Sequence, residues 1–215
     1  MSVPSAIRVL LVDDHSVVRE GVRLMLAAAA DIRLAAEAAD AGSAIQAVRR
    51  GAIDVVIADV NLPDRNGLEL LGMIKRERPD LPVLMLSMYT EDAYAVRALQ
   101  LGAAGYLTKN VEAEVLAGAI RKAAAGGKYV TPMLAEKLAT ALQPGAGLAP
   151  HERLSAREFE VLRHIVAGTS LVDAAALMHL SPKTVTAYRA RILEKTGLSN
   201  NAELTRYALE RNLFH

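Results

Sequence analysis

The sequence predicts a doubly wound α/β unit built on a five-stranded parallel sheet, followed by a small all-α domain. Three observations carry this prediction. Short apolar runs alternate with helix-length amphipathic patterns through the first part of the chain, as expected for a parallel sheet with helices on both faces. Residues 143–150 then combine Pro, Gly and small side chains, the composition of a mobile tether. Only helical patterns follow this tether.

The expected elements of the first unit follow from hydrophobic periodicity. The strands are expected at residues 7–12, 32–37, 55–60, 83–87 and 104–108. The helices between them are expected at residues 17–30, 43–50, 68–78, 91–101 and 112–125. One more helix is expected at residues 128–142, entered through Thr131-Pro132, because proline is tolerated in a first turn. The first domain is therefore assigned to residues 6–124, and a linker holding this last helix and the tether to residues 125–150.

The C-terminal domain, residues 151–215, is predicted to contain four short helices. Their expected ranges are 156–167, 171–178, 182–196 and 202–212. Ser181 is suited to cap the third of them and Pro182 to occupy its first position. This third helix carries four basic residues, Lys183, Arg189, Arg191 and Lys195, which indicates a nucleic-acid reader.

Composition narrows the classes of function. The chain has 215 residues, 52% of them hydrophobic, but only 4% aromatic and no Trp, so a broad base-stacking surface for single strands is not expected. Without Cys there is no disulfide, thiolate zinc site or cysteine nucleophile. The first residues lack the regions of a signal peptide and no apolar run approaches a membrane span, so we expect a cytoplasmic protein. Net charge is only +1, so the position of the charges, not their sum, identifies a nucleic-acid binder.

Carboxylates gather where two expected strands end. Asp13 and Asp14 follow the first strand and Asp59 lies late in the third. The carboxyl ends of parallel strands meet at one edge of a sheet, where open α/β folds bind ligands. A lone Asp there is more often a turn residue than a reactive group. Three that converge repel one another unless a cation lies among them, and oxygen ligands suit Mg²⁺.

The three aspartates and three further parts of the chain resemble the receiver domain of two-component response regulators. The further parts are the segment from Asn61 to Gly67, Ser87, and the segment from Tyr106 to Lys109. The match runs from about residue 7 to about residue 124 and preserves both order and spacing. The resemblance implies a flavodoxin-like fold and a phosphoryl group accepted by Asp59 from a sensor histidine kinase. It further implies Mg²⁺ as cofactor, with the metal site made of Asp13, Asp14, Asp59 and the backbone carbonyl of Asn61.

The same resemblance assigns a switch to three residues. Lys109 is expected to pair with a phosphoryl oxygen, the Ser87 hydroxyl to donate to another, and Tyr106 to turn inward as Ser87 shifts. Asn110 departs from the family, because many receivers carry a proline there after a cis peptide bond, and the geometry of the Lys109-Asn110 bond is left open. His15 follows the two aspartates but is assigned to the surface, since Mg²⁺ prefers oxygen.

The C-terminal domain resembles the LuxR-type helix-turn-helix of NarL/FixJ-class regulators. Three segments carry this resemblance: Leu154 to Leu162, Leu180 to Val185 and Glu194 to Leu198. In the third helix Val185, Ile192 and Leu193 are expected to face the core. The residues expected to contact DNA are Lys183, Thr184, Thr186, Ala187, Tyr188, Arg189, Ala190, Arg191 and Lys195. Leu171-Val172-Asp173 departs from the polar or basic start that the family commonly has in the supporting helix.

Together the two resemblances imply a phosphorylation-dependent transcriptional regulator, not an enzyme beyond its own phosphorylation and dephosphorylation. Its expected partners are a sensor histidine kinase, a promoter with an inverted repeat, RNA polymerase as a further candidate, and a second copy when phosphorylated. Leu204, Ala208 and Leu209 are candidates for the dimer surface, with packing inside the domain as the equal alternative.

Two other classes of function compete with this interpretation. The first is a Mg²⁺-dependent phosphohydrolase of the haloacid dehalogenase type, which would show Asp-x-Asp after the first strand where this chain has Asp13-Asp14-His15. The second is an output domain that binds RNA or only protein, for which no RNA-recognition signature is present.

Overall fold

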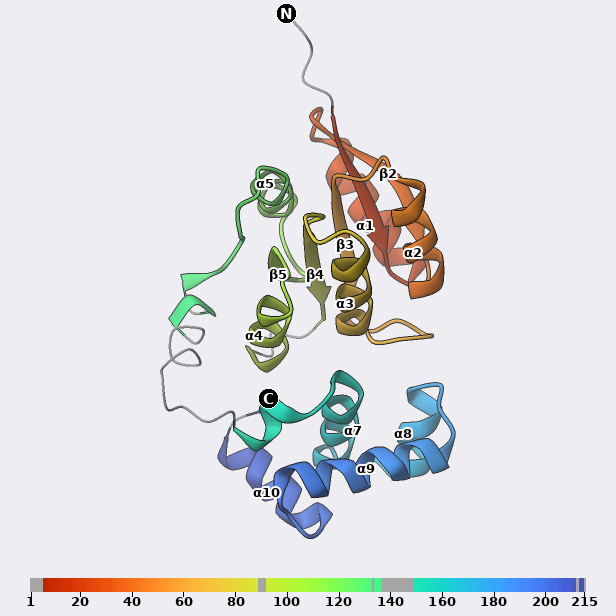
Figure 1. The fold of residues 1–215 in the computed structure, drawn as a ribbon, viewed down its shortest axis with the longest axis vertical. Coiled ribbons are helices and arrows are strands. Elements are labelled where there is room, and N and C mark those ends of the chain that lie inside the picture. The colour runs from red at the N-terminus through yellow and green to blue at the C-terminus, as the bar shows by residue number, and fades with distance from the viewer. Residues whose placement is uncertain (1–5, 89–91, 133, 137–148, 212, 215) are drawn as a thin grey trace, which may run out of the picture. The chain divides into compact units, whose positions relative to one another are not determined.

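The computed structural model describes residues 6–88, 92–132, 134–136, 149–211 and 213–214. The chain divides into two compact units, one of residues 1–90 and 95–134, the other of residues 91–94 and 135–215. Figure 1 shows an α/β unit and a helical unit, as the sequence predicts.

The first unit is built on a five-stranded parallel sheet in the order β2-β1-β3-β4-β5. Its strands are β1 (Ile7–Val12), β2 (Ile32–Ala38), β3 (Val55–Asp59), β4 (Val83–Ser87) and β5 (Gly105–Thr108). Every neighbouring pair is parallel, so the carboxyl ends of β1, β3, β4 and β5 lie along one edge. The doubly wound order places β3 at the centre, and Asp59 is its last residue.

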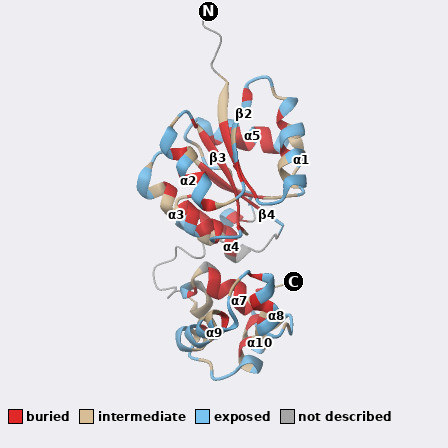
Figure 2. Cartoon of the chain, turned by 90° about the vertical axis from the view of Figure 1, so that its right-hand side faces the viewer, coloured by how far each residue is buried: buried red, intermediate tan, exposed pale blue. Residues whose placement is uncertain are grey.

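Helices cover both faces of this sheet (Figure 1). They are α1 (Ser16–Ala27), α2 (Ala41–Arg50), α3 (Gly67–Glu77), α4 (Asp92–Gln100) and α5 (Ala113–Ala124). Helix α1 packs beside α5 and helix α2 beside α3. Figure 2 shows strands β3 and β4 as completely buried, consistent with their nearly continuous apolar sequences, whereas the edge strand β2 alternates between buried and more exposed residues.

The alternation of side chains along each strand assigns one core to each face of the sheet. Val9 and Leu11 of β1 pack in one cluster with Leu26 of α1 and Ile120 of α5. Leu10, between them in sequence, points to the opposite face because successive side chains of a strand alternate. All three β1 residues are completely buried. Because these strands are buried on both faces, they hold the residues at their carboxyl ends in fixed positions.

The structure corrects the start of the helix expected at residues 128–142. Tyr129 is extended and forms a parallel bridge with Gly105 of β5, its amide donating to the carbonyl of Ala104 at 2.7 Å. A side chain at position 105 would place its Cβ 2.7 Å from the carbonyl oxygen of Tyr129, so glycine permits this approach. Helical backbone is present at Pro132 and from Leu134 to Glu136, and the rest of the predicted helix lies outside the described residues.

Between residues 149 and 211, the structure describes a short 3₁₀ turn and four helices in the second unit. Their bounds are η1 (Pro150–Arg153), α7 (Ala156–Val166), α8 (Leu171–Leu177), α9 (Pro182–Thr196) and α10 (Asn201–Glu210). Each α-helix begins at a side-chain cap: Ser155, Ser170, Ser181 and Asn200 all accept a hydrogen bond from the backbone amide three residues on. Helix α9 ends at Gly197, whose φ of 70° is the left-handed conformation that favours glycine.

A small core joins the four helices. Its completely or almost completely buried members are Leu154, Leu162, Ala174, Ala175, Val185, Ile192, Leu204 and Ala208. Helix α9 packs against both α7 and α8, so one side of it is committed to the core and the other faces solvent. Within the part of the chain that the structure describes, none of the helices has the length and apolar character needed to cross a membrane.

Candidate functional site

The carboxyl edge of the sheet brings three charged side chains into direct contact. The Nζ of Lys109, just after β5, lies 2.7 Å from Oδ2 of Asp13 and 2.7 Å from Oδ2 of Asp59. Asp13 follows β1 and is completely buried, and Asp59 is 2% exposed. One buried ammonium therefore bridges two buried carboxylates that lie 46 residues apart in the sequence. The structure brings together these predicted site residues as the parallel topology requires.

The cluster carries more negative charge than its single cation balances. Burial raises the pKa of Asp59 from 3.8 to about 6, the neighbouring charge of Asp13 adds to this, and Lys109 only partly opposes it. Burial acts to lower the pKa of Lys109, but its hydrogen bonds to Asp13 and Asp59 outweigh burial and raise it. The two buried carboxylates therefore repel one another, and a second cation bound in the pocket would reduce this repulsion.

Asp14 and His15 form the exposed rim of the same pocket. The Nδ1 of His15 lies 2.7 Å from Oδ1 of Asp14 and 3.3 Å from Oδ1 of Asp13. The His15 side chain is 63% exposed, in agreement with its assignment to the surface. One ligand atom from each of Asp13, Asp14, His15 and Asp59 lies within 4.8 Å of all the others, a spacing that suits a metal ion.

The turn after β1 is held by hydrogen bonds that fix the two aspartates. The other Asp13 oxygen, Oδ1, accepts the backbone amide of His15 at 2.8 Å, and the Asp13 carbonyl accepts Nη1 of Arg19 at 2.7 Å. Arg19 in turn donates through Nε to Glu37 of β2 at 3.1 Å. Asp13 therefore has little freedom to move toward or away from the centre of the pocket.

The loop between β3 and α3 is held close against Asp59. A side chain at Gly67 would place its Cβ 2.0 Å from the carbonyl oxygen of Asp59, so no other residue fits there without a backbone shift. The Asn66 side chain caps α3 by accepting the amide of Leu68 at 2.9 Å. Asn61, whose carbonyl is the predicted metal ligand, forms a bridge with Asn66 across this loop.

Asp64 also fixes this loop, a role that sequence reasoning missed. Its carboxylate accepts the backbone amides of Ala41 at 2.9 Å and Gly42 at 3.2 Å, in the first turn of α2. These amides have no partner inside the helix, and a carboxylate at a helix N-terminus is favourable. The sequence shows only an acidic residue in a turn, and nothing in its spacing indicates this link to α2.

The predicted switch residues lie beside the cluster. Ser87 ends β4 and is completely buried, and Tyr106 of β5, paired with Met85 of β4, is also buried. The amide of Lys109 donates to the carbonyl of Ser87 at 2.7 Å. Since the described residues contain no cis peptide bond, the Lys109-Asn110 bond is trans.

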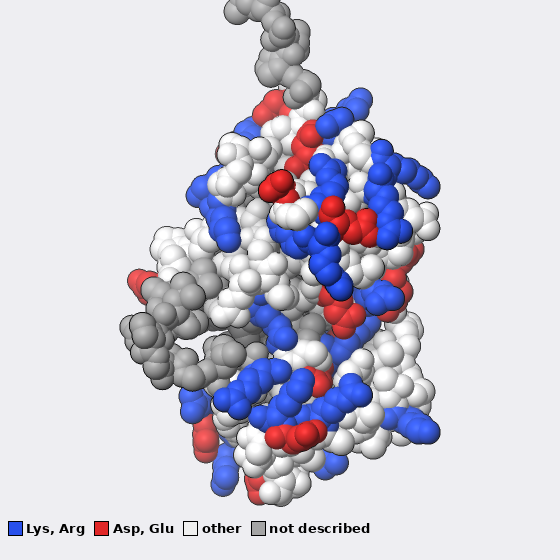
Figure 3. Space-filling model, viewed as in Figure 1, with Lys and Arg blue, Asp and Glu red and all other residues white. Residues whose placement is uncertain are grey.

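Helix α9 presents the predicted DNA-reading face to solvent. Lys183, Thr186, Ala187, Ala190 and Arg191 are exposed, whereas Val185 and Ile192 are buried and Leu193 is half-buried. Figure 3 shows Lys and Arg side chains gathered over this helix. The outward face therefore alternates short side chains with long basic ones.

Two of the basic residues predicted to touch DNA are engaged within the domain. The Nζ of Lys195 lies 2.6 Å from Oε2 of Glu158, a carboxylate that is nearly buried, and Nε of Arg189 donates to Asn201 at 2.6 Å. Burial acts to raise the pKa of Glu158, but hydrogen bonds from Lys195 and Ser155 lower it. These contacts favour a structural role for Lys195, which ties α9 to α7, and for Arg189, which ties α9 to α10.

The remaining predicted contacts on α9 also have neighbours. The Thr184 hydroxyl lies 2.8 Å from that of the Ser181 cap, and the guanidinium of Arg191 lies 5.9 Å from the ring centre of Tyr188. Helix α8 starts with a negative group, because Asp173 accepts the Ser170 hydroxyl at 2.6 Å. The start of α8 thus offers no cation to a DNA phosphate.

The structure revises the candidates for a dimer surface. Leu204 and Ala208 are buried in the core of the helical unit, since the face of α10 that carries them packs on α7. Leu209 is 59% exposed and is the one candidate of the three that a partner can reach. Helical spacing alone does not distinguish a core-facing stripe from a partner-facing one.

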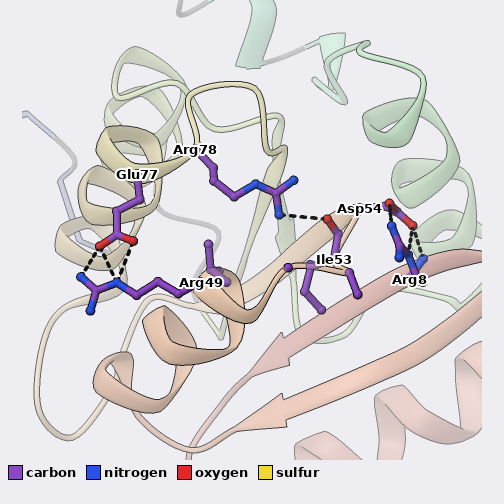
Figure 4. A pocket seen from close by; sticks show the side chains of 9 residues that line it. Arg8, Arg49, Ile53, Asp54, Glu77 and Arg78 are labelled. Atoms are coloured by element: carbon purple, nitrogen blue, oxygen red, sulfur yellow. Dashed lines mark hydrogen bonds and ion pairs between the residues drawn. The ribbon is translucent and has the colours of Figure 1, made fainter.

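A hollow of about 410 Å³ lies at the opposite, amino-terminal edge of the sheet (Figure 4). Arg8 and Asp54 form a salt bridge of 2.8 Å across its wall, and Arg49 donates to Glu77 at 2.9 Å. Arg78 donates to the carbonyl of Ile53 at 3.3 Å. These pairs join β1 to the start of β3 and α2 to α3, so the hollow is explained by structural contacts.

Two family models match the chain, one for each unit. Residues 9–121 match the response regulator receiver domain, and residues 152–208 match the bacterial regulatory proteins of the luxR family. The matched ranges coincide with the sheet and its carboxylate cluster and with helices α7 to α10.

Related proteins extend the match over nearly the whole chain. The response regulator UvrY of Escherichia coli (strain K12) is 35% identical over 208 residues, which cover 96% of this chain and 95% of UvrY. The response regulator GacA of Pseudomonas viridiflava is 36% identical over 208 residues, with 96% and 97% coverage. RcsB from Salmonella enterica serovar Typhimurium, solved bound to promoter P1flhDC in the presence of the phosphomimetic BeF₃⁻, matches at 27% identity and a TM-score of 0.65 over 94% of this chain and 98% of RcsB. The chain belongs to the NarL/FixJ-class response regulators, which join a receiver domain to a LuxR-type DNA-binding domain.

Proposed function

We propose that Asp59 accepts a phosphoryl group from a phosphohistidine of a sensor kinase, and that this event controls promoter binding by α9. The observation that carries the proposal is the position of Asp59. It ends the central strand, is buried, and shares the Lys109 ammonium with Asp13 at 2.7 Å. Burial raises the pKa of the Asp59 carboxyl from 3.8 to about 6, and among the described residues no other carboxyl group has a resolved upward shift of its pKa.

The chemistry is nucleophilic attack by a carboxylate. An oxygen of Asp59 forms a bond to phosphorus while the phosphorus–nitrogen bond breaks, and the electron pair of that bond stays on the kinase imidazole. Lys109 moves its charge from the Asp59 carboxylate to an oxygen of the transferred group. The chain therefore supplies the nucleophile and a cation, both buried at the carboxyl edge of the sheet.

The donor set of the pocket suits Mg²⁺. Asp13, Asp14 and Asp59 provide carboxylate oxygens, and the carbonyl of Asn61, two residues after Asp59, is the expected further ligand. The raised pKa of Asp59 reflects burial first and then repulsion from Asp13, which a divalent ion would relieve. When bound, Mg²⁺ supplies charge that neutralises the oxygens of the transferring group.

The switch follows from the neighbours of Asp59. Phosphorylation adds about −1.5 to −2 charge and three acceptor oxygens. The buried Ser87 hydroxyl, at the end of the adjacent strand, donates to one of them, and Tyr106 moves with Ser87. Tyr106 is buried beside Ser87, and phosphorylation shifts the population between two arrangements of this pair.

The output is recognition of double-stranded DNA by a pair of helical units. Lys183 and Arg191 hold phosphates or guanine, while Thr186, Ala187 and Ala190 lie against base edges and thymine methyls. One small helix-turn-helix makes few contacts, whereas a symmetric dimer reads two half-sites of an inverted repeat together. Leu209 contributes to the pairing surface, and RNA polymerase is the next partner once promoter DNA is bound. Kinase, promoter and regulator meet in the cytoplasm.

The test is phosphorylation of the full chain by acetyl phosphate with Mg²⁺, followed by intact-mass measurement. The wild type gains one phosphoryl mass and Asp59→Asn gains none. Asp14→Ala is no longer phosphorylated in the presence of Mg²⁺. Asp31→Asn, which changes an exposed carboxylate at the other edge of the sheet, is phosphorylated as wild type. Phosphorylation of Asp59→Asn at the wild-type level would overturn the assignment. Release of phosphate from an added phosphomonoester would support the phosphohydrolase alternative instead.

A further inference from the structure

The rim of the acidic pocket contains one nitrogen donor that the proposed Mg²⁺ chemistry does not use. His15 follows directly after Asp13-Asp14 and lies at the start of α1. Its Nδ1 lies 2.7 Å from Asp14 and 3.3 Å from Asp13. The inference below rests on the proposed function, since it concerns the same metal site.

The backbone of His15 holds the start of α1, but its side chain serves neither as a helix cap nor in the core. It is the N-cap of α1, but its side chain forms no capping hydrogen bond. Its ring is largely exposed, so it contributes little to the core. Within the described residues, the partners of the ring are the two carboxylates of the pocket, which points to a role in the pocket.

The spacing of the donor atoms fits one ion. Two ligand atoms each about 2.1 Å from an ion and at right angles to one another are about 3 Å apart. The distances of 2.7 and 3.3 Å from Nδ1 to the aspartate oxygens lie on either side of that value. All four donor groups, including Asp59, keep their nearest ligand atoms within 4.8 Å.

The side on which His15 lies also agrees with this geometry. Lys109 holds the Oδ2 atoms of Asp13 and Asp59. The Asp13 oxygen nearer to His15 is the other one, Oδ1. An ion that avoids the ammonium therefore enters on the side of the pocket where the imidazole is.

We infer that His15 is a nitrogen ligand which lets the phosphoryl site bind borderline divalent ions, such as Co²⁺ and Zn²⁺, in addition to Mg²⁺. Imidazole is a favourable ligand for these ions and adds little for Mg²⁺, which keeps to oxygen. His15 therefore sets the ion selectivity of the receiver and makes its phosphorylation site responsive to transition metals.

The experiment is calorimetric titration of the untagged, metal-free full chain with Co²⁺ and separately with Mg²⁺, while the visible absorption of Co²⁺ reports its ligands. His15→Ala weakens Co²⁺ binding by about tenfold or more and leaves Mg²⁺ affinity within about twofold. His15→Asn, which restores an oxygen donor, also fails to restore Co²⁺ binding. His179→Asn, an exposed histidine on the helical unit, serves as the control and binds both ions as wild type.

Two results overturn the inference. Unchanged Co²⁺ affinity in His15→Ala excludes the imidazole as a ligand. Equal loss of Co²⁺ and Mg²⁺ affinity shows instead that His15 merely orients the aspartates. In either case, Mg²⁺-dependent labelling of Asp59 by acetyl phosphate, measured on the same variant, remains a separate readout of the proposed function.

Discussion

The carboxyl edge of the sheet and the outward face of α9 hold charge in opposite ways. At the sheet edge, Asp13, Asp59 and Lys109 are buried and bonded to one another, so the charges act on each other in a medium of low polarity. On α9, Lys183 and Arg191 are exposed and their charge is solvated. At the sheet edge the buried carboxylates repel one another before any partner binds. On α9 the basic side chains gain interaction energy only when a partner binds. This contrast separates a switch from a reader.

The largest expected effect tests the repulsion between the buried carboxylates Asp13 and Asp59. Without divalent ions, Lys109→Met leaves two buried carboxylates without a cation and destabilises the receiver by about 3 kcal/mol or more near neutral pH. Asp59→Asn removes the carboxylate whose pKa burial raises, and stabilises it by up to about 3 kcal/mol. Urea unfolding of the full chain in EDTA, followed through amide signals of the sheet, measures both.

The dependence on pH gives the sign of this effect. The pKa of Asp59 rises from 3.8 to about 6 on folding, because burial disfavours its charge, so folded protein binds the proton more tightly. Its contribution to stability is present below pH 3.8 and is lost as pH rises toward about 6. The advantage of Asp59→Asn over wild type therefore grows across that window and is constant above it. Lys122→Met, on the exposed side of α5, is the control for Lys109→Met. A stability advantage of Asp59→Asn that did not change with pH would contradict the raised pKa of Asp59.

A smaller effect tests how closely the loop before α3 approaches Asp59. Gly67→Ala introduces a Cβ at 2.0 Å from the Asp59 carbonyl, so the backbone must move. We expect a loss of about 1 to 3 kcal/mol in stability and slower phosphorylation by acetyl phosphate. Gly21→Ala, in α1 with no atom within 4 Å of its Cβ, is the matched control and stabilises by about 0.5 to 1 kcal/mol. Equal stability of the two variants would contradict the close approach.

The smallest effect separates the two lysines of α9. Lys195→Met removes the cation from the nearly buried Glu158 and destabilises the helical unit by about 1 kcal/mol, because the Lys195 side chain is itself 37% exposed. Lys183→Ala leaves stability within about 0.5 kcal/mol but lowers the slope of log affinity for DNA against log salt by about 0.9, because a phosphate contact releases counterions. Salt titrations of both variants, with thermal unfolding in parallel, measure the division. A lower slope in Lys195→Met would return that residue to the DNA-contacting set.

The same contrast explains what the sequence could predict. The five-stranded parallel sheet and the convergence of Asp13 and Asp59 follow from periodicity and parallel topology, whereas the strand order and the place of Lys109 were expected from the resemblance to receiver domains. Contacts between distant segments have no local signal, which is why Asp64 on the start of α2 and Tyr129 on the sheet edge were missed. On α9, helical period predicts which residues are exposed but not that Lys195 reaches Glu158. On α10 it identifies a stripe, Leu204 and Ala208, without saying that this stripe faces the core.

The central claim is that a phosphoryl group on Asp59 raises the affinity of α9 for DNA by pairing two chains. The most direct test is an equilibrium titration of an inverted repeat and of its single half-site, using DNA enriched from a random pool, with and without acetyl phosphate. The account predicts tighter binding to the inverted repeat after phosphorylation, a much smaller change on the half-site, and no change on either DNA for Asp59→Asn. Equal affinity of the phosphorylated chain for both DNAs, or a response to acetyl phosphate in Asp59→Asn, would contradict it.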